Sequence, residues 1–276
     1  MSDELTRADE LLRDAERAER LGDDRTAADR ARRALAALRG HVGESADAVR
    51  IDALAILVAV ATNLGEWDEA ARRLAELRAI DPSAPEADFL ESALRLERWD
   101  LDGAAALLVG CDADAVGAGE LEFRRAIVAE LRGEFDVADV HYAAATRFDP
   151  TIPTPVRIDL DEAHALLTAI VDSFPPDVRD ALGGIQIDLL EIPEPAVDRS
   201  TDLGPTVLGY YDGVPLNERE SIQPLGLDRI RIFKRNIERE VTSRDELVEQ
   251  LRITLLHEVG HHLGWDEHEL HERGIG

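Results

Sequence analysis

Residues 257–267 read HEVGHHLGWDE and contain the spacing H-E-x-x-H. Successive residues of an α-helix are about 100° apart around the helix axis, so His257 and His261 are only about 40° apart, one turn along. Both imidazoles can therefore reach one ion, and Glu258 flanks the same face. Two histidines at this spacing, with a glutamate after the first, are typical of a Zn²⁺ site in which the glutamate is the general base.

A third protein ligand is expected just after this helix. If the helix continued straight on, Glu267 would lie about 240° from His261 and farther along the axis, out of reach of the ion. Gly264 can adopt the left-handed conformation that ends a helix and lets the chain turn back. Asp266 or Glu267 can then supply a carboxylate oxygen. The spacing favours Glu267 as the third metal ligand, with Asp266 as the alternative.

The helix that carries the histidines is predicted to begin after Ser243, because Ser243–Glu246 forms the capping box S-x-x-E. Apolar residues follow at four-residue steps and give the helix a core-facing stripe, namely Leu247, Leu251, Leu255 and Val259. Gly260 costs about 1 kcal/mol relative to alanine inside a helix. We therefore expect another segment, or the substrate, to pack closely against Gly260.

Three segments before this helix alternate between apolar and polar residues, as half-buried strands do: residues 184–189, 206–211 and 229–233. A helix is expected over residues 160–174. Two interpretations of Arg229–Phe233 are open. It is either the sheet edge beside the metal, where an extended peptide can pair, or an ordinary strand with solvated arginines.

Several other side chains near this region are weighed for a role. Tyr210 or Tyr211 is expected either to donate a hydrogen bond to the oxyanion formed during attack on a carbonyl or to pack as a buried aromatic residue. His262 is expected in a supporting or surface position. The remaining histidines of the second half are interpreted as packed or solvated groups, namely His164, His268 and His271.

The first half of the chain predicts an all-helical repeat. GEWD at residues 65–68 recurs as GEFD at residues 133–136, and the dipeptide DP at residue 81 recurs at residue 149. Both separations correspond to two periods of 34 residues, which is typical of stacked helix pairs. ERWD at residues 97–100 is interpreted as a degenerate middle copy, and LGDD at residues 21–24 as a first copy. The aromatic residues of these copies, Trp67, Trp99 and Phe135, are expected in the core.

These residues resemble the tetratricopeptide (TPR) family, with a glycine between paired helices and a small residue, Ala70 or Ala138, where the second helix crosses closely. The resemblance covers residues 1–150 and implies stacked helix pairs with a concave surface. A protein partner is expected on that surface, although a plain structural platform fits equally well. Residues 151–156 follow as a proline-rich linker, since the prolines at 150, 153 and 155 cannot continue a helix.

Composition limits the function classes. The net charge of −27 makes nucleic-acid binding unfavourable. Cys111 is the only cysteine, so no intramolecular disulfide can form. The longest apolar run, near residues 54–61, is too short to span a bilayer, and the N-terminus lacks a basic and apolar leader. The sequence therefore predicts a soluble, cytoplasmic protein that does not bind membranes.

Residues 157–276 resemble the minimal zincin-like metallopeptidases of bacteria. The resemblance rests on LGYYDG at residues 208–213, RIFKRNI at residues 231–237 and residues 257–270. It implies a small α+β domain with one active-site helix and Zn²⁺ on His257, His261 and an acidic residue. It also implies that Glu258 is the catalytic base. Members of the family have aspartate at the position of Glu267.

The predicted architecture is thus an all-α TPR-like domain followed by an α+β zincin-like domain. The predicted function is a zinc-dependent hydrolase acting on a peptide or protein substrate. Glu258 would take a proton from the attacking water and pass it to the leaving amine. Two alternatives stay open: an interaction scaffold with a structural or inactive zincin-like domain, and a hydrolase for a non-peptide amide.

Overall fold

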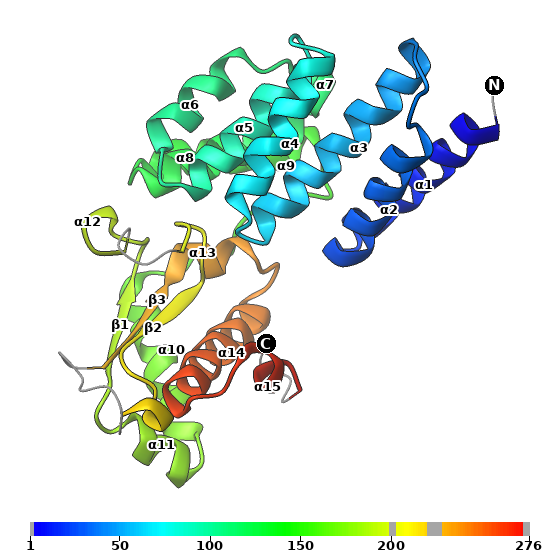
Figure 1. The fold of residues 1–276 in the computed structure, drawn as a ribbon. Coiled ribbons are helices and arrows are strands. Elements are labelled where there is room, and N and C mark those ends of the chain that lie inside the picture. The colour runs from blue at the N-terminus through cyan, green and yellow to red at the C-terminus, as the bar shows by residue number, and fades with distance from the viewer. Residues whose placement is uncertain (1–2, 199–202, 220–227, 273–276) are drawn as a thin grey trace. The chain divides into compact units, whose positions relative to one another are not determined.

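The computed structural model describes residues 3–198, 203–219 and 228–272. The described chain divides into two compact units, residues 3–149 with 203–204, and residues 150–198 with 205–219 and 228–272 (Figure 1). No helix within the described residues combines the length and the apolar character needed to cross a membrane.

The described part of the first unit is helical. Its helices are α1 (Asp3–Arg20), α2 (Asp24–Ala37), α3 (Glu44–Asn63), α4 (Trp67–Ile80), α5 (Pro85–Glu97), α6 (Leu101–Gly110), α7 (Ala113–Val116), α8 (Ala118–Leu131) and α9 (Phe135–Phe148). Helices pack in sequential pairs, α1 with α2, α3 with α4, α5 with α6, and α8 with α9. Alanine and leucine side chains fill the cores between them.

Equivalent features of this unit recur every 34 residues. The second helix of three successive pairs begins at residues 67, 101 and 135, which are steps of 34. Three fully buried alanines recur with the same step and allow these helices to approach closely, namely Ala70, Ala104 and Ala138. The arrangement is compatible with a helical repeat, whereas its assignment to the TPR family stays a prediction.

The expected alignment of the middle copy was wrong by two residues. Trp99 takes the place of the turn glycines Gly65 and Gly133, because all three have a positive φ and stand 34 residues apart. Leu101, rather than Trp99, therefore corresponds to Trp67. A left-handed conformation costs a residue other than glycine about 1 kcal/mol. A tryptophan is therefore not expected at the turn position, and the tetrapeptide ERWD suggested instead that Trp99 corresponds to Trp67.

The second unit has a small mixed sheet covered by helices. Its described elements are α10 (Leu160–Ser173), α11 (Pro176–Leu182), β1 (Gln186–Leu190), α12 (Pro195–Asp198), β2 (Gly209–Asp212), the 3₁₀ helix η1 (Leu216–Glu218), β3 (Arg229–Phe233), α13 (Lys234–Arg239), α14 (Arg244–Leu263) and α15 (Glu267–Glu272). β1 is parallel to β3, and β2 is antiparallel to β3. The three predicted strands are present, although β1 and β2 begin later than expected.

The strand order β1-β3-β2 corrects the interpretation of Arg229–Phe233 as a sheet edge. β3 is the central strand, with neighbours on both sides. The alternative of solvated arginines is also wrong for Arg231, which is only 5% exposed. Its guanidinium lies 2.9 Å from the carboxylate of Asp198, at the end of α12. The buried positive charge of Arg231 is therefore paired with this carboxylate.

Helix α14 lies against the sheet (Figure 1), and its apolar stripe faces that sheet. Ile230 and Ile232 of β3 are fully buried against α10 and α14. Leu247, Leu251 and Leu255 complete that core from α14. The four-residue steps of the stripe thus fix which side of α14 faces the sheet and which side can carry the histidines.

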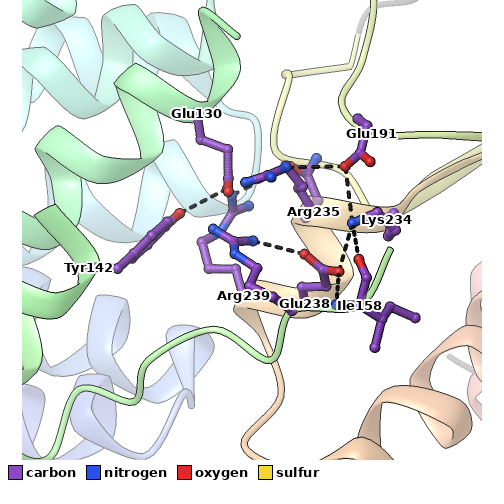
Figure 2. Close-up of polar contacts among 10 residues, drawn as sticks. Glu130, Tyr142, Ile158, Glu191, Lys234, Arg235, Glu238 and Arg239 are labelled. Carbon is purple, nitrogen blue, oxygen red and sulfur yellow. Dashed lines mark hydrogen bonds and ion pairs between the residues drawn. The ribbon is translucent and has the colours of Figure 1, made fainter. Parts of the chain in front are cut away.

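A buried ion cluster holds the beginning of this unit against α13. Figure 2 shows the ammonium of Lys234 between Glu191, Glu238 and the carbonyl of Ile158. The three N–O distances are 2.8–3.0 Å, so every proton of this buried ammonium has an acceptor. Glu238, which is fully buried, also accepts from the N–H of Ile158 and from Arg157. The chain that enters the unit is therefore anchored at Arg157 and Ile158.

Candidate metal centre

Helix α14 begins where the capping box predicted. The hydroxyl of Ser243 accepts the N–H of Glu246 at 3.3 Å. The carboxylate of Glu246 in turn accepts the N–H of Thr242 at 2.7 Å. The helix then runs without interruption to Leu263, so His257, Glu258 and His261 all lie on one continuous element.

The two motif histidines and Glu267 converge. The Nε2 atoms of His257 and His261 are 3.0 Å apart. The Oε1 atom of Glu267 lies 3.3 Å from Nε2 of His261 and 3.7 Å from Nε2 of His257. These three residues form a group of donors that could hold a metal ion. Ligands about 2.0–2.2 Å from a tetrahedral Zn²⁺ are about 3.3–3.5 Å from one another, so the donor set fits that ion.

Electrostatics at His261 favour the form that binds metal. Burial lowers the pKa of His261, and the neighbouring His257 lowers it further, while the carboxylate of Glu267 opposes both effects. A neutral imidazole has a free lone pair for a cation, whereas an imidazolium does not.

The turn at Gly264 returns the chain to the histidines. Gly264 has φ 87° and ψ 24°, the left-handed conformation expected of it. Its N–H donates to the carbonyl of His261, and the N–H of Trp265 donates to the carbonyl of Gly260. The amide of Asn217 in η1 donates to the carbonyl of Gly264 at 3.1 Å. These bonds satisfy main-chain carbonyls at the C-terminal end of α14 and turn the chain back toward that helix.

Glu258 is buried beside the histidines and is only 5% exposed. Its carboxylate accepts the main-chain N–H of Tyr211, at the end of β2. Burial raises the pKa of Glu258 to about 8, and Glu267 adds to the rise, while the N–H of Tyr211 opposes it. A dication on the adjacent histidines would favour the carboxylate form.

The structure also shows a polar network that the sequence motif does not reveal. The hydroxyl of Tyr211 donates to the carbonyl of Val214 at 3.1 Å, and Nδ1 of His262 lies 3.1 Å from the same hydroxyl. Asp228 pairs with Arg219 and lies 3.7 Å from Nδ1 of His262. His262 is therefore buried between α14 and β2 rather than at the surface. Its position depends on the pairing of β2 and could not be found from helix spacing.

Neither tyrosine has a hydroxyl free for an oxyanion. Burial raises the pKa of Tyr211 to about 12, so that its proton stays on the hydroxyl and is donated to Val214. The hydroxyl of Tyr210 donates to the buried carboxylate of Asp198. His164 and His268 lie outside the metal-binding group, and both are exposed.

Gly260 is packed against the segment that carries Glu267. A methyl group at Gly260 would lie 2.3 Å from Cδ2 of Leu270 and 3.0 Å from the ring of Trp265. Leu270 is fully buried, so it has little room to move. The close packing expected here comes from the chain itself, from Trp265 just before α15 and from Leu270 within it.

We expect Gly260→Ala to lower the free energy of unfolding by about 1–2 kcal/mol, because overpacking exceeds the gain of about 1 kcal/mol in helix propensity. It should also weaken Zn²⁺ binding by displacing α15. Chemical denaturation and chelator competition measure the two effects. Gly110→Ala is the control, since a methyl group at that helical glycine meets nothing within 4 Å. Equal stability and equal zinc affinity for Gly260→Ala and wild type would contradict the packing argument.

The raised pKa of Glu258 predicts a pH-dependent stability of the metal-free protein. An acid whose folded pKa lies above its unfolded value stabilises the fold at low pH and loses that contribution as the pH rises to the folded pKa. Between pH 5 and pH 8 the metal-free protein should lose about 3 kcal/mol through this group. Denaturation of wild type and Glu258→Gln tests this, because the difference between them should grow with pH. A pH-independent difference would contradict it.

Comparison with known families gives a match in the second unit. Residues 182–276 match the model of the zincin-like metallopeptidase family, a zinc-dependent family. The match begins at the end of α11 and includes the sheet, α14 and α15. The helical first unit has no match to the TPR family. A comparison with curated proteins gives no match.

Proposed function

We propose that the chain is a zinc-dependent peptidase in which His257, His261 and Glu267 hold the ion and Glu258 is the general base. One observation carries the proposal: the three donor atoms converge within reach of one ion, directly beside a buried carboxylate on the same helix. When bound, Zn²⁺ acidifies a water molecule and polarises the scissile carbonyl. The family match over residues 182–276 supports this chemistry.

The protein's own residues have distinct tasks in this proposal. Glu258 accepts the proton of the attacking water and delivers it to the leaving amine. The N–H of Tyr211 fixes the orientation of the Glu258 carboxylate. The left-handed turn at Gly264 brings Glu267 to the histidines.

The substrate is proposed to be an extended peptide that pairs with β2. In the described sheet, β2 has a neighbour on one side only. The N–H of Phe233 donates to Leu208, so with the observed register residues 208, 210 and 212 bond to β3. Gly209 then directs both of its main-chain groups to the unpaired edge, and Tyr211 directs its carbonyl there, since the N–H of Tyr211 is bonded to Glu258. Because Tyr211 reaches Glu258 from that edge, a peptide paired there would lie next to the proposed base.

A cleavage screen tests the proposal. The full chain is loaded with Zn²⁺ and incubated with a peptide library and with protein substrates, and products are identified by mass spectrometry. We expect cleavage that stops when a chelator removes zinc and returns when zinc is restored. A zinc-loaded chain that cleaves nothing would contradict the peptidase and favour the interaction scaffold.

A second proposed role is recognition of a partner or substrate by the helical unit. Three open cavities of about 340, 520 and 320 Å³ lie along it. Equivalent residues, 34 positions apart, line them: Val60, Leu94 and Val128. The same screen tests this role. If proteins are cleaved no better than short peptides with the same target sequence, the cavities do not contribute to substrate recognition.

A further inference from the structure

The residue before Glu267 forms a second capping box in this domain. Oδ1 of Asp266 accepts the N–H of Glu269 at 2.9 Å. Oε2 of Glu269 accepts the N–H of Asp266 at 3.1 Å. These reciprocal bonds satisfy main-chain donors at the start of α15, with Asp266 in the N-cap position and Glu269 three residues later. The carboxylate of Asp266 is thus directed to its own helix.

Helix α15 depends on such anchors because it is short. It has only six residues, and isolated helices of that length are not stable in water. Leu270, which is fully buried, packs against Gly260 and anchors the middle of the helix. The capping box anchors its start, which is where Glu267 lies.

Within the described residues, few contacts hold the side chain of Glu267. Glu267 has a 75% exposed side chain. Its carboxylate contacts the imidazoles of His257 and His261. The direction of its carboxylate is therefore set by the main chain in the first turn of α15. The capping box formed by Asp266 and Glu269 stabilises that turn.

We propose that Asp266 and Glu269 are positioning residues for the metal, which order the first turn of α15 and so place Glu267 on the ion. The inference rests on the metal site of the proposed function, although it does not depend on peptide cleavage. It also explains why Glu267 rather than Asp266 is the proposed third ligand. The carboxylate of Asp266 caps α15, whereas the carboxylate of Glu267 can bind the metal.

Zn²⁺ affinity of the full chain tests this role, measured by competition with a chromogenic chelator. Loss of a cap weakens a helix by a factor of about 5, so Asp266→Ala and Glu269→Ala should each weaken Zn²⁺ binding by about 5-fold. Asparagine is as good a cap as aspartate, and glutamine can replace glutamate in the box. Asp266→Asn and Glu269→Gln should therefore bind within about twofold of wild type. Glu272→Ala, which removes an acid from the end of α15, is the control for charge.

Three results of this measurement would overturn the proposal. If Asp266→Asn loses as much affinity as Asp266→Ala, the charge of Asp266 and not its capping bond matters. If Asp266→Ala binds like wild type, the box does not position Glu267. Should Glu267→Gln keep its zinc while Asp266→Asn loses it, Asp266 is the third ligand.

Amide hydrogen exchange of the metal-free chain gives an independent measurement. Residues 267–272 should exchange several-fold faster in Asp266→Ala than in wild type, whereas Asp266→Asn should be unchanged. Unaltered exchange in Asp266→Ala would overturn the ordering role, even in a preparation that binds no zinc. Absence of zinc binding by wild type would instead contradict the proposed function itself.

Discussion

Replacing Glu258 by glutamine is expected to lower kcat for peptide hydrolysis by a factor of about 10²–10⁴, the usual contribution of a general base, while zinc stays bound. Glutamine has the same shape and can still accept the N–H of Tyr211, but it cannot take a proton from water. The measurement is kcat together with the zinc content of the same preparation.

The control for this variant is Glu249→Gln, which changes an exposed acid on the same helix. It should retain the kcat of wild type. If Glu258→Gln cleaves as fast as wild type with zinc in place, Glu258 is not the base. Another group would then have to be sought among the residues that face the metal.

His261→Ala should have the second large effect. It removes one of the three proposed ligands. Mutation of a residue that only hydrogen-bonds to a ligand can weaken metal binding by a factor of about 100, so the loss of a ligand itself should weaken Zn²⁺ binding by at least that factor. Hydrolysis should be lost with the metal. Chelator competition and metal analysis after dialysis measure the effect.

The matched control is His268→Ala, because His268 is an exposed histidine of α15 outside the metal-binding group. It should bind zinc like wild type. If both variants bind equally well, the three-residue site is wrong. If both lose zinc to the same degree, the ion has another position.

Local features of the second unit were predictable because they depend on neighbours in sequence. The capping box at Ser243 and the left-handed Gly264 set the start and end of α14. Residues four apart share a face of any helix, so the proximity of His257 and His261 also followed from spacing alone. Alternation predicted β3 with the bounds that the structure has.

Other features required the packed chain. The position of β3 between β1 and β2 follows from pairing between distant segments, and alternation along one strand contains no information about its neighbours. The pKa of Glu258 depends on burial under β2 and on an N–H donated by Tyr211, 47 residues away (258 − 211). His262 likewise acquires its partners only when β2 lies beside α14.

The candidate metal-binding stretch, residues 257–267, also combines features that the sequence predicts with one that depends on the tertiary structure. Sequence alone determined that two histidines share a helix face and that the chain must turn at Gly264, since both depend on bonds within a few residues. It left Asp266 and Glu267 as alternatives. Only the tertiary structure shows how the two carboxylates lie, because their directions depend on how α15 packs: Glu267 faces the histidines, whereas Asp266 bonds to the main chain of α15.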